Sequence, residues 1–557
     1  MITSGFEELV ETYIPIYWND YGGVFNMEPS QSPFIPFNGQ IRDVLYGYID
    51  FVKGFEDKVI DSWPLQRLRY IYQLQAAHFI YPNATHTRFA HSIGVMHSSF
   101  KYVSNLLRTS YHLPEESESR REIIKHQKEI IFASRLLGLM HDLGHGPFSH
   151  AFDKYVYKTR EFLGYSIGNH EVVGYLIYRQ VLREKIFELA LNSAKTLGLD
   201  PEVLISLLDE GMKPPRGMRD FTDLVSRSLL SDEDFYNPSV NGLSSMVRLV
   251  VRDYAYTSDI MDYLKRDSFF TGVPVGEIND DWIIRNTFLV EKNNMIIPGV
   301  TRKSLDEIAR LFDARKIMYK NVYLHPVNVA FIEMIGYLLQ CLRSRLAEII
   351  EEMLQSPENL SKYFLLTDHS LYSMLAGLMH EDLTAYECVD KDLARKALQS
   401  LFIERKPVWK MVGRFNYNLK HAKHLFSERF GEAYQKTLKD KIGEEISAVL
   451  KSKNVNPSDI LTIIDKVEIY PSSGSEVLDK IHVVEIRGGK VIDLEELTYE
   501  EFAQQHGLIP EVLFTIYVNR EIYKDLSSSD IKKAQESAEE VIKEALYGGG
   551  REAPETS

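Results

Sequence analysis

Apolar residues recur at helical spacing through most of the first 345 residues. The clearest segments are KEIIFASRLLGLMHDL and SLDEIARLFDARKIMYKNVYL, and both predict helices. Between such segments lie LPEESESRRE, MKPPRGMRD and TGVPVGEIND, whose Pro, Gly and charged residues predict loops. RLAEIIEEML and ARKALQSLF continue the helical pattern downstream. We therefore expect a mainly α fold.

The pattern changes beyond about residue 442. ILTIIDKVEIYP, KIHVVEIRGGKVIDL and EVLFTIYVN are β-branched and predict short strands, followed by a charged helix, SSDIKKAQESAEEVIKEAL. We see no internal repeat. The expected organisation is an irregular lead-in (1–40), a helical catalytic domain (41–345), a helical extension (346–441), a smaller α+β C-terminal region (442–547) and a disordered tail (548–557).

Composition narrows the class of protein. The chain of 557 residues is 44% hydrophobic and 26% charged, which suits a soluble globular protein and excludes a wholly disordered or collagen-like chain. A net charge of −15 argues against a generic nucleic-acid coat protein. Only Cys341 and Cys388 occur, so we expect neither a disulfide framework nor a cysteine zinc site. With no signal peptide and no apolar span, this predicts a cytoplasmic protein without a membrane segment.

Histidines are concentrated in one part of the chain. Ten of the 17 lie between His78 and His170, where even spacing would place about three. Within this part, an apolar helix over residues 130–140 runs directly into His141 and Asp142. Burying an imidazole and a carboxylate there is unfavourable unless something compensates them, and a divalent cation does so.

The alternative for an isolated HD dipeptide is a helix cap with solvated side chains. His145 and His150 follow within the same short segment and favour the cation. His91 begins another predicted helix and adds a third nitrogen donor.

Two downstream helices carry further candidates. Asp259, Tyr263 and Asp267 are spaced i, i+4 and i+8 and so share one helix face, although a surface helix would show the same spacing. Arg315 and Tyr323 share a face of another helix in the same way. An arginine with tyrosines suits a phosphate beside a base or sugar, but a packing stripe fits the spacing equally well.

Several motifs of the chain resemble those of a known family. The order H…HD…D, here His91, His141–Asp142 and Asp259, is similar to that of the HD-domain metal-dependent phosphohydrolases. The resemblance is closest to the deoxynucleoside triphosphate (dNTP) triphosphohydrolases of the SAM-and-HD-domain type, through QRLRYIYQL, HTRFAHSIGV, HDLGHGPFSHAFD, NHE and SDIMDYLKRD. It covers most of the chain from about Ile41. We expect no counterpart of the SAM domain, because only about 40 residues precede it.

The resemblance implies one divalent metal (Mn, Fe, Zn, Mg or Ni) and hydrolysis of a dNTP to a deoxynucleoside and inorganic triphosphate, by attack on the α-phosphorus. The implied metal ligands are His91, His141, Asp142 and Asp259. The implied catalytic residues are His145 first and His170 second, with His150 and Asp153. A surface histidine before EVVGYLIY is the alternative for His170.

The same resemblance implies a substrate pocket. Arg88 matches a phosphate-contacting arginine. The residues that match the surroundings of the deoxyribose, phosphates and base are Gln73, Tyr263, Asp267, Arg315 and Tyr323. In the family, the ring of the tyrosine that Tyr263 matches blocks a 2′-hydroxyl.

Relatives work as dimers or tetramers, so a homo-oligomer is expected. Asp61, Gln66 and Arg69 match positions that bind a guanine-nucleotide activator at a subunit interface; packing of a structural helix is the alternative.

Some positions depart from the family. Ile260 stands where relatives have a lysine, and Tyr319 and Pro326 replace a histidine and a lysine. Gln75-Ala76-Ala77 replaces a glycine-rich stretch. Arg42 replaces an asparagine at the activator site. These departures remove two lysines that contact phosphate in relatives, and Arg42 changes the activator site.

Two other functions fit parts of the sequence. A different HD phosphohydrolase, such as a nucleoside monophosphatase or cyclic-nucleotide phosphodiesterase, would share the metal ligands. A single-stranded nucleic-acid binder on an HD scaffold is suggested by the basic, aromatic residues 404–426, although a solvated helix and strand edge explains them as well.

Overall fold

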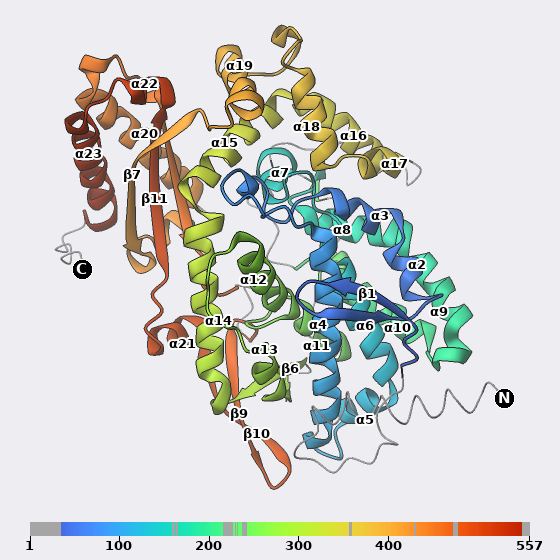
Figure 1. Cartoon of the computed structure of the whole chain (residues 1–557). Coiled ribbons are helices and arrows are strands. Elements are labelled where there is room, and N and C mark those ends of the chain that lie inside the picture. Colours follow the sequence, from blue (N-terminus) through green and yellow to red (C-terminus); the bar gives the residue numbers. More distant parts are fainter. Residues whose placement is uncertain are drawn as a thin grey trace. The chain divides into compact units, whose positions relative to one another are not determined.

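Figure 1 shows the computed structural model of the chain. It describes residues 35–158, 162, 165–215, 227–228, 230, 232–236, 242–293, 295–355, 359–427, 430–471 and 477–548. The chain divides into two units, Met1–Pro36 and Phe37–Ser557, and the second contains everything discussed below. Most of the expected lead-in and tail lies outside the described residues.

The fold is mainly α, as predicted, and a long buried helix organises its core. Helix α6 (Gln127–Met140) is buried from Glu129 onward, because apolar or small residues occupy nearly every position. It packs against α4 (Arg88–Thr109), α10 (Pro201–Met212) and α11 (Gly242–Val251), while α12 (Ser258–Thr271) packs against α4. Two of the predicted site segments, on α4 and α12, therefore meet beside the end of α6.

Other helices surround this core. They include α2 (Glu56–Ile60), α3 (Trp63–Arg67), α5 (Glu118–Lys125), α7 (His150–Phe152), α8 (His170–Ile177), α9 (Arg183–Leu197), α13 (Asp280–Arg285), α14 (Leu305–Met318), α15 (Pro326–Cys341), α16 (Arg343–Gln355), α17 (Leu360–Phe364), α18 (Asp368–Gly377) and α19 (Lys391–Gln399). Single π-helical turns η5 (Asp153–Tyr157) and η11 (Tyr319–Tyr323) follow α7 and α14.

The predicted C-terminal strands form, but two of them join strands that the sequence pattern did not predict. β9 (Lys480–Arg487) and β10 (Lys490–Thr498) belong to a four-stranded sheet of order β10-β9-β6-β5, with β5 (Thr287–Lys292) and β6 (Met295–Thr301). β6 and β9 pair in parallel, almost 200 residues apart in sequence. A hairpin of β1 (Gly39–Asp43) and β2 (Gly47–Phe51) was also not predicted.

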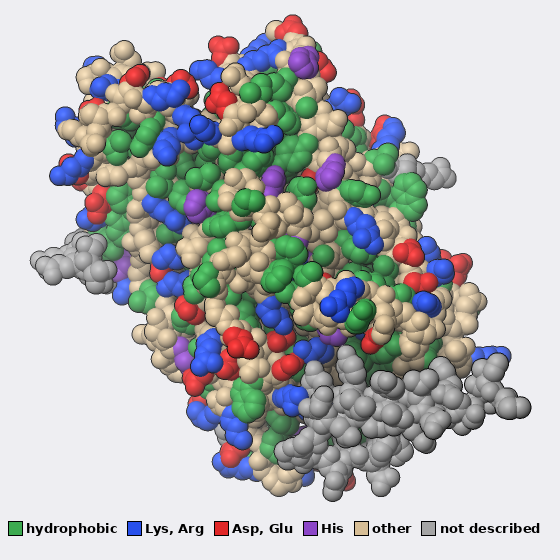
Figure 2. Space-filling view, in the orientation of Figure 1, with side chains coloured by type: hydrophobic (Ala, Val, Ile, Leu, Met, Phe, Trp, Pro, Cys, Tyr) green, Lys and Arg blue, Asp and Glu red, His purple; other side chains and the backbone are tan. Residues whose placement is uncertain are grey.

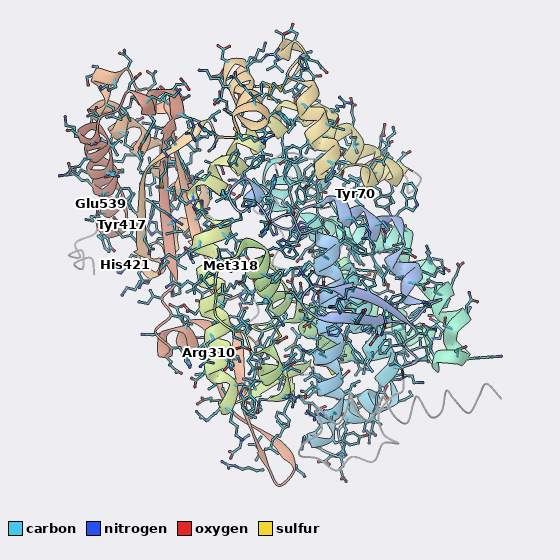
Figure 3. The ribbon with its side chains drawn as sticks, in the orientation of Figure 1. Tyr70, Arg310, Met318, Tyr417, His421 and Glu539 are labelled. Atoms are coloured by element: carbon cyan, nitrogen blue, oxygen red, sulfur yellow. A yellow bond between two sulfur atoms is a disulfide. The ribbon has the colours of Figure 1, made fainter. Side chains whose placement is uncertain are left out.

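A second sheet lies in the C-terminal region. Its order is β7-β11-β8, with β7 (Trp409–Asn418), β8 (Ile460–Val467) and β11 (Glu511–Asn519). α20 (Gly431–Val449) and α23 (Ser528–Tyr547) pack on it and complete an apolar core. β7 lies within the segment expected to be helical. Its Tyr417 is close to α23, where burial and the charge of Glu539 raise the pKa of the phenol (Figure 3).

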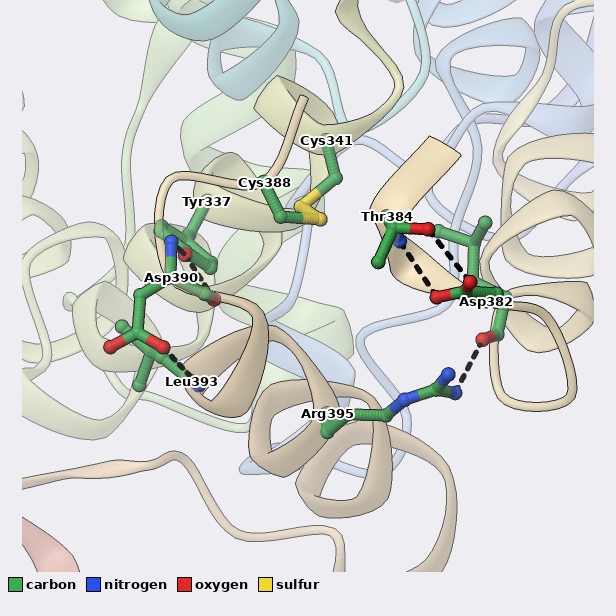
Figure 4. The surroundings of a disulfide bond; sticks show 9 residues. Tyr337, Cys341, Asp382, Thr384, Cys388, Asp390, Leu393 and Arg395 are labelled. Carbon is green, nitrogen blue, oxygen red and sulfur yellow. Dashed lines mark hydrogen bonds between the residues drawn. A yellow bond between two sulfur atoms is a disulfide. The ribbon is translucent and has the colours of Figure 1, made fainter. Parts of the chain in front are cut away.

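The two cysteines correct an expectation. Cys341, at the end of α15, and Cys388, just before α19, are joined by a disulfide that closes a loop of 47 residues (Figure 4). Asp390, two residues beyond Cys388, accepts from Leu393 N as the cap of α19 and donates its own N–H to Tyr337 of α15. The sequence predicted no disulfide framework, because nothing in the local patterns around the two cysteines shows that they meet.

Among the described residues no single helix is long and apolar enough to cross a membrane. One bent pair, Arg302–Tyr323 with Pro326–Cys341 at 59°, meets the length and composition test only when the two helices are taken together. On the face that Figure 2 displays, acidic and basic side chains are interspersed rather than gathered into one patch of a single sign.

Candidate active site

The predicted metal ligands converge beside the end of α6. Nε2 of His91 lies 3.2 Å from Nε2 of His141 and 3.0 Å from Oδ1 of Asp259. Oδ1 of Asp142 lies 3.4 Å from Nε2 of His141. Helices α4, α6 and α12 thus bring together two imidazoles and two carboxylates that are distant in sequence.

The other nitrogen of each ring fixes which atom faces the site. Nδ1 of His141 lies 2.7 Å from the carbonyl of Gly138, which only accepts, so this nitrogen carries the proton. Nδ1 of His91 lies 2.8 Å from Oδ2 of Asp262. In the neutral rings, both Nε2 lone pairs therefore point at one another and at carboxylates. This donor set fits a divalent cation such as Zn, Mn or Fe.

Without a metal, the carboxylates favour positive charge on His91, which a bound cation would replace. Burial would lower the pKa of His91, but hydrogen bonds and charge from Asp259 and Asp262 raise it to about 10. Burial would raise the pKa of Asp142, but Arg88 and the neighbouring histidines hold it well below its usual range. Arg88 donates to Asp142 at 2.6 Å and to the Ser149 hydroxyl at 2.8 Å. Burial would also raise the pKa of Asp259, but hydrogen bonds from His141 and His91 hold it below its usual value, so both carboxylates are ionised, as metal ligands need to be.

Three more histidines form a second cluster around Asp153. Oδ2 of Asp153 lies 2.6 Å from Nδ1 of His170 and 3.3 Å from Nδ1 of His150. The rings of His145 and His170 stack with centroids 3.6 Å apart. Nε2 of His145 lies 3.4 Å from Oδ1 of Asp142, so this cluster adjoins the first. His170 is 15% exposed at its side chain and is not the surface residue of the alternative interpretation.

The two stacked histidines titrate in opposite directions. Burial and the positive charges of Arg88 and His170 lower the pKa of His145 well below its usual value. Burial also acts against charge on His170, but Asp153 overcomes it and raises the pKa of His170. A neutral ring thus stacks on one that holds its proton more tightly.

The predicted sugar-binding residues lie next to the metal ligands. Tyr323 donates to Oδ2 of Asp267 at 2.7 Å, and His86 lies 2.8 Å from Oδ1 of the same carboxylate. Burial raises the pKa of Tyr263, one turn from Asp259 on α12, so its phenol is neutral. The Oε1 atom of Gln73 is buried and has no hydrogen-bond partner among the described residues.

Arg315 is contacted from the C-terminal region. It donates to Oε2 of Glu468 at 3.2 Å, and Tyr319 donates to the same oxygen at 3.1 Å. Glu468 follows β8 directly. One guanidinium N–H is therefore taken up by an acidic residue that sequence analysis did not identify.

One cavity of about 490 Å³ unites these groups. Its lining includes His91, His141, Asp142, Asp259, His145, His150, His170, Gln73, Arg88, Tyr263, Asp267, Arg315 and Tyr323. Asp153 is not among the lining residues and lies behind His150 and His170. The volume is in the range of small-molecule sites.

The predicted activator residues are not part of this cavity. Arg69 donates to Oε1 of Gln66 at 2.7 Å, and its guanidinium lies 3.7 Å from the ring centroid of Phe89. Gln66 donates to the carbonyl of Ile60. Asp61 ends α2 and is exposed. These contacts match the packing alternative and leave the regulatory role a prediction.

Three residues that sequence analysis missed support the site. Asp262 holds His91 and is itself bonded to Arg266 at 2.8 Å. Arg67 donates to the carbonyl of His145 at 2.7 Å. Asp368 accepts from the backbone N–H groups of Tyr72 and Phe148, and burial raises its pKa to about 7. The i+3 spacing of Asp262 from Asp259 was a usable signal, whereas the other two contacts span long stretches of chain.

Comparison with known proteins agrees with the geometry. Residues 88–210 match the HD domain family. The chain is 26% identical over 338 residues to a putative HD domain-containing protein of Acanthamoeba polyphaga mimivirus, covering 60% of this chain and 63% of that protein. It is 26% identical over 291 residues to the deoxynucleoside triphosphate triphosphohydrolase SAMHD1 of Bos taurus, covering 52% and 45%.

A solved structure shows the same fold. A hypothetical protein from Aquifex aeolicus superposes with a TM-score of 0.56 at 21% identity, over 89% of this chain and 100% of that one. The chain spans about half the length of several curated relatives that it matches. It carries an HD domain and, over about half its length, resembles proteins named as dNTP triphosphohydrolases.

Proposed function

We propose that this protein hydrolyses deoxynucleoside triphosphates to a deoxynucleoside and inorganic triphosphate. The observation that carries the proposal is the single cavity that joins the four metal donors to Arg88, Arg315 and the Tyr263–Asp267–Tyr323 group. Phosphates, a sugar and a divalent cation each find suitable partners there. The similarity to relatives named as dNTP triphosphohydrolases supports the same substrate class.

His91, His141, Asp142 and Asp259 would hold one divalent ion, whose chemistry is to polarise a phosphate and acidify a water. Arg88 is held rigidly by Asp142 and Ser149, so its position is fixed before substrate enters. A fixed guanidinium stabilises negative charge on a phosphate without reorganising. Arg315 adds a second guanidinium from α14.

The stacked histidines divide the proton transfer between them. His170 keeps a proton through Asp153 and is the better donor to the leaving 5′-oxygen. His145, neutral and 3.4 Å from Asp142, is placed to orient the attacking water. This assignment reverses the order of the two histidines expected from sequence.

Sugar choice follows from Tyr263, Asp267 and Tyr323. Tyr323 and His86 hold the carboxylate of Asp267, which can accept from a 3′-hydroxyl. The half-buried ring of Tyr263 lines the cavity and restricts space beside it. A ribose with an additional 2′-hydroxyl would be excluded sterically.

The test is incubation of purified protein with each dNTP and NTP, with Mn, Fe, Zn, Mg or Ni, and chromatographic separation of products. The proposal predicts equimolar deoxynucleoside and triphosphate. Release of orthophosphate from monophosphates, or opening of cyclic nucleotides, would instead identify another HD phosphohydrolase. His141→Ala and Asp142→Ala should lose both bound metal and activity. Full metal occupancy in Asp142→Ala would reject the ligand assignment.

The nucleic-acid alternative has less support. Within the basic segment, Arg414 donates to the carbonyls of Lys320 and Leu324, and Lys423 pairs with Glu500. Arg414 and Lys423 thus already have partners within the protein. A steep salt dependence of single-strand binding would favour this alternative.

We further propose a homo-oligomer, with guanine-nucleotide activation through Asp61, Gln66 and Arg69 as a separate hypothesis. Turnover of dATP with and without GTP, followed together with light scattering, tests both. Unchanged rates and mass would remove the regulatory site and leave the catalytic assignment in place.

A further inference from the structure

The cavity extends beyond the predicted sugar-binding residues to a wall of hydrogen-bond acceptors. Asn328 and Glu333 of α15 and Asp465 of β8 all line it. These three residues were not identified from sequence and play no part in the steps above. We call them the acceptor wall.

A chain of contacts connects the metal donors to this wall. Asp259 and Asp267 lie two turns apart on α12, and Tyr323 donates to Asp267. Asn328 donates from Nδ2 to the carbonyl of Tyr323 at 3.2 Å. Glu333 lies further along the same helix. A nucleotide with phosphates at the metal donors and its sugar at Tyr323 would therefore direct its base toward the wall.

Asn328 presents a fixed and unsatisfied acceptor. Its Nδ2 donates to the carbonyls of Val322 and Tyr323, each at 3.2 Å, so the amide cannot turn over without losing both bonds. Its Oδ1 has no partner among the described residues, although Asn328 is only 3% exposed. An unpartnered buried acceptor is unfavourable and is satisfied when a donor arrives.

The carboxylates of Glu333 and Asp465 also favour a ligand that donates hydrogen bonds. Lys154 donates to Oε1 of Glu333 at 2.7 Å, and Glu333 also interacts with the Tyr155 hydroxyl. Burial and the charge of Glu333 raise the pKa of Asp465 to about 6, with Lys154 acting against them. A ligand edge with N–H donors would satisfy these acceptors, whereas a carbonyl edge would have to compete with Glu333 for Lys154, which also lines the cavity.

We propose, on the basis of the proposed function, that the acceptor wall accepts hydrogen bonds from the exocyclic amino group of the base and so selects dNTPs that carry one. Cytosine N4 is a donor that Glu and Asp accept from, whereas the C4 oxygen of uracil and thymine is an acceptor. Sites built to hydrogen-bond a substrate group reject analogues that lack it, because their polar groups are left unpaired. Bases with an amino group should therefore outrank uracil and thymine.

The cleanest comparison is dCTP with dUTP, which have the same ring size and differ at C4 and N3. The wild type should show a kcat/KM about tenfold higher for dCTP, the size of one hydrogen bond to a charged group. Glu333→Gln supplies an amide N–H to the C4 oxygen and should reduce the ratio to about twofold or less. Asp465→Asn should reduce it in the same direction. Glu348→Gln, on the exposed face of α16, is the matched control and should keep the wild-type ratio.

Binding of dCTP and dUTP in EDTA, by calorimetry, separates this inference from the proposed function. Hydrolysis of both nucleotides with equal kcat/KM would overturn the base selection and leave the function standing. Tighter dCTP binding that is lost in Glu333→Gln, without hydrolysis of any dNTP, would overturn the function and support the selection. A dCTP preference unchanged in both wall variants, with unchanged thermal unfolding midpoints, would also overturn the assignment to this wall.

Discussion

Nδ1 of His91 lies 2.8 Å from Oδ2 of Asp262, and both side chains are almost fully buried. This contact leaves Nε2 of His91 free to face the other donors of the metal cluster. Asp262 is in turn fixed by two bonds from Arg266, which also donates to Asp43. The orientation of one proposed metal ligand thus depends on a buried chain of charges that reaches the β1–β2 hairpin.

Asp262→Asn should weaken metal binding about 10- to 100-fold, because the amide orients and polarises His91 less well. The measurement is the metal dissociation constant by competition with a chromophoric chelator. Asp281→Asn is the control, since Asp281 is half exposed and pairs with Lys101, away from the metal ligands. An unchanged metal dissociation constant in Asp262→Asn would show that metal binding does not depend on the contact between Asp262 and His91.

Tyr263→Ala should reduce the preference for dATP over ATP, because removal of the half-buried ring opens space for a 2′-hydroxyl. The ratio of the two kcat/KM values is the measurement. Phe269→Ala, on the same helix but 58% exposed, should keep the wild-type ratio. Equal turnover of ATP and dATP by the wild type would contradict the sugar pocket.

Asp153→Asn should shift the basic limb of the kcat–pH profile to lower pH. The Asp153 charge raises the pKa of His170, so the variant has a lower pKa. A general acid acts in its protonated form, and His170 would therefore lose its proton at lower pH. The profile between about pH 6 and 9 tests this. If kcat falls in the variant but the basic limb of the profile stays at the same pH, Asp153 has a structural role and does not set the pKa of the general acid.

Protein purified without reductant should contain no free thiol, because Cys341 and Cys388 are paired. Reduction should lower the thermal midpoint, since a loop of this length contributes about 4 kcal/mol in the chain-entropy description. Thiol titration in denaturant is the direct measurement, and Cys388→Ser is the control that exposes one thiol. Two titratable thiols in the untreated wild type would contradict the pairing.

Local patterns predicted much of the site. The i, i+4, i+8 spacing placed Asp259 and Asp267 on one face of α12, and the apolar run before His141 predicted α6. Contacts between distant segments had no local signal. The parallel pairing of β6 with β9 and the bond from Arg67 to the carbonyl of Leu366 depend on tertiary packing. The acceptor wall was missed for the same reason, because Asp465 reaches the cavity from a strand more than a hundred residues beyond α15.

Hydrolysis of dATP in ¹⁸O-labelled water shows which phosphorus the proposed reaction attacks. With the metal that supports turnover, attack of water on the α-phosphorus should give unlabelled deoxyadenosine and inorganic triphosphate that carries one ¹⁸O, by mass spectrometry. His141→Ala should give neither product. Deoxyadenosine diphosphate with ¹⁸O in orthophosphate would place the attack at the γ-phosphorus and rule out triphosphate release.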